Sequence, residues 1–306
     1  MFKNLLIYAI APGWRQSVES MEASLLGALF IPCGPTVDRS FGWVPPRGEK
    51  EGALVEAIGG QRILKFLLEA RILPASVVNQ KAQEQAEHIE ASTGRKPGKK
   101  ETRDIKDDVR LTLLPQAFTK QSSLHVWVDP KAHRLVIDAA SVKRAEEVVS
   151  LLVHCLPGFA VRLVSTATSP AVAMGQWLQS GEPPARFSVD RECELKAADE
   201  TQAVVRYARH ALDIDEVRAH IESGKQPTRV ALTWIGRVSL VLTDNLQLKK
   251  LSFLDVVFEG KAGTPDADGF DADVAIATSE LSALIPDLLL ALDGETEGNA
   301  EAATEA

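Results

Sequence analysis

The feature that most limits the possible folds is a pair of hairpin patterns set far apart in the chain. Residues 124–128 (LHVWV) and 134–138 (RLVID) flank the turn sequence DPKAH, and residues 228–235 and 237–243 alternate around Gly236. Such patterns predict antiparallel strand pairs. Helical spacing recurs between the strands without a regular strand–helix alternation. The sequence therefore predicts an α+β fold, with mixed antiparallel sheets and flanking helices.

The remaining elements follow from periodicity and from breaker residues. Further strands are predicted at 3–10, 61–69, 160–164, 203–208 and 247–254, and 61–69 also fits a short helix. Helices are predicted at 17–30, 141–152, 171–180 and from Asp213 or Asp215 to 222, and a last one begins at Thr278 or Ser279. Residues 31–48, rich in Pro and Gly, predict a loop.

Two polar helices between Ser76 and Leu113 are joined by the basic turn GRKPGKK. Because neither buries much apolar surface, they predict a helical hairpin that projects from the body. The expected organisation is an N-terminal α+β body (1–75 and 114–165), a helical finger hairpin (76–113), a C-terminal α+β part (166–294) and an acidic disordered tail (295–306).

Charge is divided unevenly along the chain. Residues 251–306 hold 13 acidic side chains and one basic one, so the net charge of −8 leaves +4 on residues 1–250. The N-terminus lacks the pattern of a signal peptide, and no apolar run approaches the roughly 20 residues of a membrane span. Three cysteines without a CxxC motif favour a reducing compartment and no zinc site. A cytoplasmic protein without a membrane partner is expected.

Two groups of basic residues suit phosphate oxygens. The first surrounds the turn of the hairpin: Arg95, Lys96, Lys99, Lys100 and Arg103. The second belongs to the C-terminal part: Arg206, Arg209, His210, Lys225, Arg229, Lys249 and Lys250. Because Lys249 and Lys250 are adjacent in a predicted strand, only one of them is expected to share a face with a given partner. Charge alone leaves open that both groups are ordinary solvated surface.

No motif of a nucleotide-binding loop or a nucleophile elbow is present. No catalytic residue, metal site or cofactor is therefore expected. One enzymatic alternative stays open, a metal-dependent nuclease that uses Asp271 and Asp273 with Glu280, because hard cations favour several carboxylates. These acids serve equally well as solvated loop residues or structural caps.

A series of collinear motifs resembles one protein family. They include FKNLLIY at 2–8, GWVPP at 42–46, LLPQAF at 113–118, IDAASVKRAEE at 137–147, QWLQSG at 176–181, HIESGK at 220–225 and LKKLSF at 248–253. Together they resemble the RdgC family of bacterial recombination-associated proteins, in order from residue 2 to about 294.

The resemblance implies a nucleoid-associated protein that binds DNA without sequence preference and has no catalytic activity. It implies a ring-shaped homodimer whose positively charged hole admits double-stranded DNA; whether the protein also binds single-stranded DNA stays open. The dimer is expected to restrain the RecA recombinase. Phe118 falls at the implied dimer contact, and Arg209 and His210 fall at an implied DNA contact. A competing interpretation is an adaptor that acts on the recombinase directly through its acidic tail.

Overall fold

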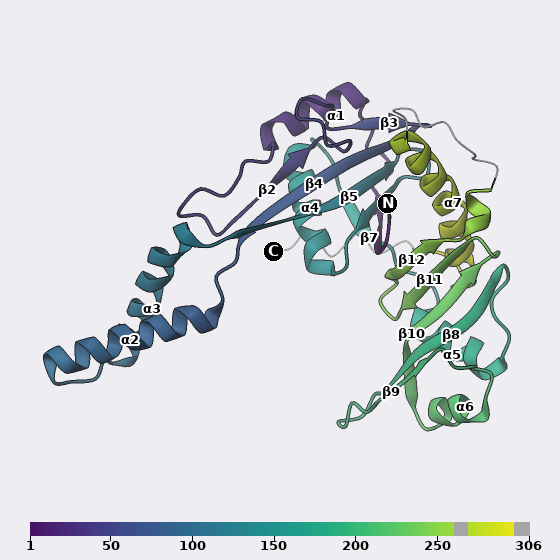
Figure 1. The fold of residues 1–306 in the computed structure, drawn as a ribbon. Helices are drawn as coiled ribbons and strands as arrows, with labels where there is room; N and C mark the ends of the chain where they lie inside the picture. The colour runs from purple at the N-terminus through teal and green to yellow at the C-terminus, as the bar shows by residue number, and fades with distance from the viewer. Residues whose placement is uncertain (260–268, 297–306) are drawn as a thin grey trace.

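The computed structural model describes residues 1–259 and 269–296 of the 306-residue chain. These residues form a crescent (Figure 1). A two-helix hairpin projects at one end, and a group of strands from the C-terminal half lies at the other. The N-terminal strands lie between them.

One antiparallel sheet runs through the crescent and confirms the predicted α+β class. Its strands follow the order β2-β4-β5-β6-β1-β12-β11-β10-β8-β9, and β3 is added to β4 and β7 to β1. The strands in the first half are β1 Leu5–Ile10, β2 Arg39–Val44, β3 Glu56–Ile58, β4 Gln61–Arg71, β5 Thr119–Asp129, β6 Arg134–Asp138 and β7 Val161–Leu163. Those in the second half are β8 Phe187–Ala197, β9 Val204–Ala208, β10 Lys225–Trp234, β11 Val238–Thr243 and β12 Leu248–Phe253.

Helices α1 (Val18–Leu25) and α4 (Val142–Cys155) cover one face of the N-terminal strands. Ser17 caps α1 as predicted, because its Oγ accepts a hydrogen bond from the Ser20 N–H at 3.1 Å. Met21 and Val148 pack with Phe66 in the same apolar core. A short 3₁₀ turn, η1 (Leu26–Ala28), follows α1.

A second core joins the two halves of the sheet. Leu5 of β1 pairs with Leu248 of β12, and both pack with side chains of α7 (Gly269–Ala291). Helix α7 is long and apolar enough to cross a membrane by length and composition alone. Its residues Leu281, Leu284 and Leu288 are fully buried in this core, which accounts for its apolar content. Helices α5 (Pro170–Ser180) and α6 (Asp215–Glu222) pack in the same core.

The predicted helical hairpin is present as α2 (Ala75–Thr93) and α3 (Lys99–Leu113). It has a small core of its own, formed by Ala82, Ile105 and Val109, which is separate from the two larger cores. Turn η2 (Leu114–Gln116) then leads back into β5. A third turn, η3 (Asp255–Val257), follows β12.

Three parts of the local prediction were wrong. The stretch 31–48 is not all loop, because it contains β2. This strand pairs with β4, and Gly42 lies against the Phe30 backbone, where an added Cβ would come within 2.5 Å of the Phe30 nitrogen. Strands β3 and β8 were not predicted; β8 is rich in charged residues and its register with β10 is shifted twice. Helix α7 begins at Gly269 rather than at Thr278 or Ser279.

The predicted disordered tail, 295–306, falls largely outside the described residues. Its first residue, Glu295, is tied to the body: its carboxylate pairs with Arg134 and Arg162, and it forms a β-bridge with Thr166. Although burial opposes it, these arginines hold the pKa of Glu295 below its ordinary value. The domain boundaries proposed from the sequence stay a prediction.

Candidate nucleic-acid interface

Strand register places most of the second basic group on one face of the C-terminal sheet. Val230, Leu232 and Trp234 of β10 point into the core. Arg229 and Ala231 alternate with them and so point outward. Arg229 pairs with Glu194 of β8, which pairs with Arg206 of β9, so one row of charge crosses three strands.

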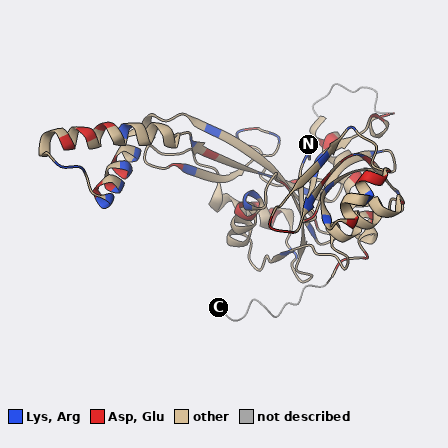
Figure 2. Cartoon of the chain, turned by 90° about the horizontal axis from the view of Figure 1, so that it is seen from below, with Lys and Arg blue, Asp and Glu red and all other residues tan. Residues whose placement is uncertain are grey.

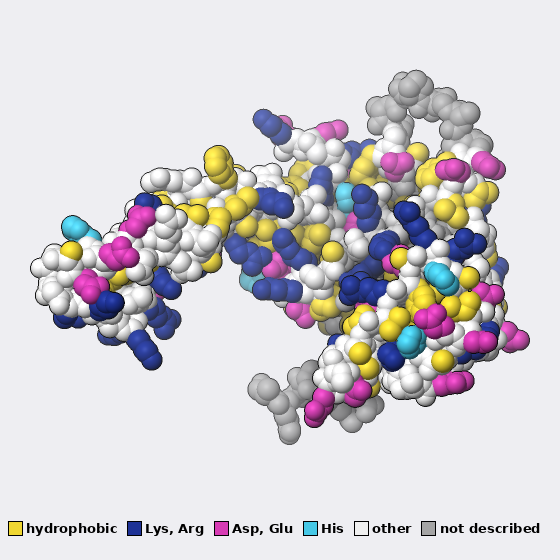
Figure 3. Space-filling view, turned by 60° about the horizontal axis from the view of Figure 1, so that its bottom comes forward, with side chains coloured by type: hydrophobic (Ala, Val, Ile, Leu, Met, Phe, Trp, Pro, Cys, Tyr) yellow, Lys and Arg dark blue, Asp and Glu magenta, His cyan; other side chains and the backbone are white. Residues whose placement is uncertain are grey.

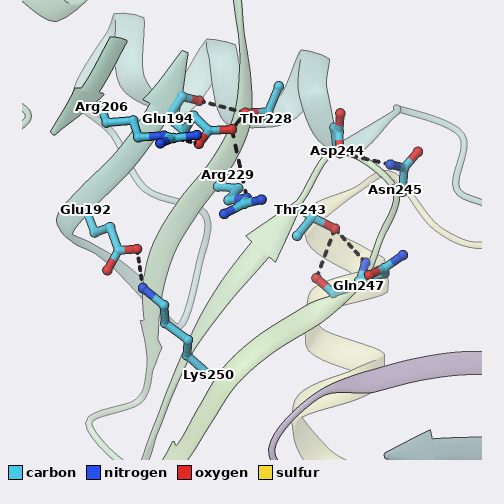
Figure 4. Close-up of polar contacts among 10 residues, drawn as sticks. All are labelled: Glu192, Glu194, Arg206, Thr228, Arg229, Thr243, Asp244, Asn245, Gln247 and Lys250. Carbon is cyan, nitrogen blue, oxygen red and sulfur yellow. Dashed lines mark hydrogen bonds and ion pairs between the residues drawn. The ribbon is translucent and has the colours of Figure 1, made fainter. Parts of the chain in front are cut away.

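Glu194 holds this row together (Figure 4). Its carboxylate accepts hydrogen bonds from Arg206 Nε at 2.6 Å and Thr228 Oγ1 at 2.8 Å, and Arg229 Nε lies 3.9 Å away. Burial acts to raise the pKa of Glu194, but the hydrogen bonds from Thr228 and Arg206 and the charges of Arg229 and Arg206 together keep the pKa below its ordinary value. The two guanidinium groups are therefore oriented by a nearly buried carboxylate.

Lys249 and Lys250 both belong to this outer face, which corrects the expectation that only one of them would. Lys249 pairs with Val241 of β11, and the register shifts between Val241 and Ser239. The shift is a β-bulge, in which Lys250 takes a left-handed φ of 51°. Leu248 and Leu251 on either side are both buried in the core, so the extra residue keeps the two lysines together on the outside. Lys250 Nζ pairs with Glu192 (Figure 4).

Arg209 completes this outer face. It lines a hollow of about 290 Å³ with Arg191 and Lys250, together with Glu192 and Asp190. Its φ of 58° is left-handed, which turns the chain at the end of β9. Arg191 was missed in the sequence because β8 itself was missed. Arg206, Arg209, Arg229, Lys249 and Lys250 together form the outer basic face.

Two predicted site residues lie apart from the outer basic face. Lys225 lines a hollow with α5 and the end of α6, in the helical layer that covers the opposite side of the sheet. Its Nζ lies 3.1 Å from His220 Nδ1. His210 follows Arg209, but its Nδ1 lies 2.8 Å from the Ala211 carbonyl oxygen and its ring lies beside Tyr207.

The first basic group lies at the far tip of the hairpin, and the start of α3 is blue in Figure 2. Glu101 has a structural role there, because it pairs with Arg95 at 3.0 Å and accepts the Gly98 N–H at 3.4 Å. Lys96, Lys99, Lys100 and Arg103 are exposed and form no ion pair among the described residues. Within one chain, the two basic groups stand at opposite ends of the crescent (Figure 1).

Further Lys and Arg side chains gather between these ends. Figure 3 shows them across the middle of the lower face, between the hairpin and the C-terminal elements. Lys65 of β4 pairs with His125 of β5, on the sheet face opposite α1 and α4. Burial and the charge of Lys65 lower the pKa of His125 to about 4, so this imidazole is neutral near pH 7.

Phe118 is the most exposed large apolar side chain among those described, at 85%. It follows the turn η2, and its carbonyl oxygen accepts the Ile72 N–H at 2.7 Å. Ile72 is itself half exposed, so two apolar side chains lie next to each other at the base of the hairpin. Arg71 fixes this base, because its guanidinium donates to the carbonyl oxygens of Leu114, Pro115 and Ala117.

The carboxylates of the nuclease alternative do not converge. Asp271 lies at the start of α7 and pairs with Arg47, which also pairs with Glu56 at 3.0 Å and lies over the Phe270 ring. Glu280 is held by Arg237 two and a half turns further along the helix. Among residues 1–259 and 269–296 no group of three potential metal ligands is found.

Comparison with known proteins identifies the family. The family model described as "Putative exonuclease, RdgC" matches residues 1–295. The Recombination-associated protein RdgC of Dechloromonas aromatica (strain RCB) is 42% identical over 299 residues, which cover 96% of this chain and 98% of the relative. The proteins of the same name from Janthinobacterium sp. (strain Marseille) and Bordetella pertussis are 41% and 40% identical over 97% and 96% of this chain and 99% and 98% of the relatives. The chain belongs to the RdgC family.

Membership of the RdgC family confirms the resemblance seen in the sequence and links the chain to recombination. The curated relatives are named for recombination and not for an enzymatic activity, whereas the family description includes an exonuclease. Because Asp271 and Glu280 are each held by an arginine, the structure does not favour the nuclease alternative.

Proposed function

We propose that this chain binds DNA through its phosphate backbone without sequence preference. The observation that carries the proposal is the outer basic face, where three strands and a bulge bring Arg206, Arg209, Arg229, Lys249 and Lys250 together. Guanidinium and ammonium groups on a sheet surface contact phosphate oxygens irrespective of the base sequence. The recombination-associated name of the relatives fits a nucleic-acid partner.

The carboxylates of this face suit reversible binding. Glu192 and Glu194 already hold three of the five cations in ion pairs. A phosphate must therefore compete with a carboxylate for each of these groups, which limits affinity at any single position. Many such contacts along a backbone give attachment that depends on salt and not on sequence.

We further propose that two chains form a ring-shaped homodimer around double-stranded DNA. The crescent supports this arrangement, because two crescents that meet at their ends enclose a hole. The exposed Phe118 and Ile72 at the base of the hairpin form an apolar contact point. In a two-fold dimer this surface is used twice, once on each subunit.

Such a clamp limits RecA-mediated strand exchange by occupying DNA in the cytoplasmic nucleoid. Occupancy requires neither catalysis nor a metal. The competing adaptor model assigns inhibition to the acidic tail instead. A chain shortened by residues 297–306 separates the two, because Glu295 remains to hold Arg134 and Arg162. A clamp keeps both DNA binding and inhibition in this variant, whereas loss of inhibition alone would support the adaptor.

The decisive experiment is a salt titration of binding to duplexes of unrelated sequence, with the mass of the free protein measured in the same buffers. We expect the mass of a dimer. We also expect equal affinities for the unrelated duplexes, and these affinities should fall steeply as the salt concentration rises. Arg209→Gln/Lys250→Gln should weaken all duplexes alike, and Lys143→Gln, which removes an exposed cation from α4, should not. A monomer that ignores duplexes at low salt would contradict the proposal.

The proposed dimer contact has its own control. Phe118→Ser removes an exposed apolar side chain that we place at the contact, and Leu290→Ser removes one of similar exposure, 75%, from α7. Burial of one phenylalanine is worth about 1.5–3 kcal/mol, and the contact occurs twice. Phe118→Ser should therefore dissociate the dimer at concentrations where Leu290→Ser leaves it intact. Equal masses for the two variants would place the contact elsewhere.

A further inference from the structure

A second concentration of positive charge lies away from the outer basic face. A cavity of about 390 Å³ opens between the end of β1, the loop that precedes α1, the start of β4 and the β5–β6 turn. Arg62 pairs with Val128, whose side chain packs in the core under α1 and α4, so the cavity belongs to the sheet face opposite Lys65. The proposed DNA contacts do not use this cavity.

The charged residues that line the cavity are all basic. Arg15, Arg62 and Lys131 contribute three cations, and His133 lies beside them, whereas no carboxylate from residues 1–259 or 269–296 belongs to the lining. None of these three cations forms an ion pair with another described residue. Glu19 acts on Arg62 from outside the lining, and the Asp129 carboxylate is occupied by the backbone N–H groups of Lys131 and Ala132. The positive charge at the cavity is therefore largely uncompensated.

The Arg62 guanidinium at the cavity has few hydrogen-bond partners. Within the part of the chain that the structure describes, Arg62 donates only to the Gln16 carbonyl oxygen at 2.6 Å and to the weak acceptor Met21 Sδ at 2.9 Å. Burial lowers the pKa of Arg62, which indicates that its charge is poorly solvated. Buried donors without partners are uncommon and costly.

We propose that this cavity binds a small organic phosphate of the size of a nucleotide. Arg15, Arg62 and Lys131 supply donors for phosphate oxygens, and Ile10, Trp14 and Pro130 supply apolar walls for a ring. The volume lies within the range of small-ligand sites. Trp14 is held in place as an apolar wall by an edge-to-face contact with Phe159, at 4.7 Å between ring centroids.

The same chemistry is available from two sources, a free nucleotide and the phosphorylated 5′ end of a DNA strand. The test is a calorimetric titration of the full chain with ADP, pyrophosphate, adenosine and a 5′-phosphorylated dinucleotide. We expect saturable binding of one ADP per chain, with adenosine at least tenfold weaker. If the dinucleotide binds, loses affinity when the cations of the cavity are replaced, and ADP does not bind, the ligand is the end of a DNA strand. The cavity is then still a phosphate site.

Two exposed cations of the lining allow a variant that leaves the core intact. Arg15→Gln/Lys131→Gln should weaken ADP binding at least tenfold, and Lys106→Gln/Lys143→Gln, which removes two exposed cations outside the lining, should not.

Three results would overturn the phosphate site. The first is that no phosphate probe binds at millimolar concentration. The second is that both double variants lose ADP affinity equally. The third is that Arg15→Gln/Lys131→Gln loses as much duplex affinity as changes to the outer basic face do. The last result would make these residues part of the DNA surface. Failure of DNA binding alone would leave the cavity proposal unaffected.

Discussion

The tip of the hairpin and the outer basic face carry similar numbers of cations but arrange them differently. At the tip, Glu101 pairs only with Arg95, and the other cations are exposed on a helical turn with a three-residue core. On the sheet, Glu192 and Glu194 orient Arg206, Arg229 and Lys250 over a large core. The cations of the tip are close together in sequence but point in different directions around a helix. The cations of the outer basic face are far apart in sequence but lie on one sheet surface.

This difference predicts unequal contributions to DNA binding. Arg209→Gln/Lys249→Gln/Lys250→Gln removes three cations from one surface. Since each phosphate contact contributes about 0.9 to the slope of log K against log salt, we expect the slope to fall by about 2.7 and the affinity near 0.1 M salt to fall at least on the order of 100-fold. Filter binding or fluorescence anisotropy over a salt series measures both. An effect no larger than that of Lys143→Gln would break the comparison.

The geometry of the tip makes a finer prediction. Lys99 and Arg103 are four residues apart on α3 and share a face, whereas Lys100 is turned away from Lys99 by about 100°. A duplex that touches one face meets the first pair together. Lys99→Gln/Arg103→Gln should therefore weaken binding about 10-fold or more, and Lys99→Gln/Lys100→Gln should weaken it less. Equal losses in the same anisotropy assay would mean that the tip does not present one face.

Removing a carboxylate from the sheet should strengthen binding. Glu194→Gln frees Arg206 and Arg229 from their ion pairs, so we expect an increase of a few fold in duplex affinity at low salt. The same change weakens the hydrogen bonds from Arg206 and Thr228, and because the Arg206 side chain is largely exposed, the free energy of unfolding should fall by only about 1 kcal/mol. Glu101→Gln is the matched change at the tip, where the freed group is Arg95 alone. Weaker DNA binding in Glu194→Gln would show that positioning matters more than free charge.

The smallest expected effect concerns acid. The pKa of Glu194 lies below its unfolded value in the folded chain, so its contribution to stability is present above the unfolded pKa and is lost as the pH falls through the folded one. Urea unfolding of the native chain should therefore lose more stability between pH 6 and about pH 3 than unfolding of Glu194→Gln does. Parallel curves for the two proteins would remove Glu194 from the acid response.

Elements with a strong local pattern were predicted from the sequence. The hairpin of β5 and β6, the hairpin of β10 and β11 and the helices α2 and α3 are present near the predicted positions. The strands that were missed have weak patterns: β2 lies between prolines, β3 has three residues, and β8 is irregular and charged. Their existence depends on partners distant in sequence, which local periodicity does not report.

The candidate site divides in the same way. The sequence alone identified the cations, the polar helical hairpin and the acidic C-terminal segment. Composition and short-range spacing, which identified them, do not depend on distant contacts. Only the tertiary structure decided that Lys249 and Lys250 share a surface with Arg206 and Arg229 while Lys225 lies with the helices. The physical reason is that strand register and a single bulge determine which face a side chain joins, and both are set by pairing with strands far away in the chain.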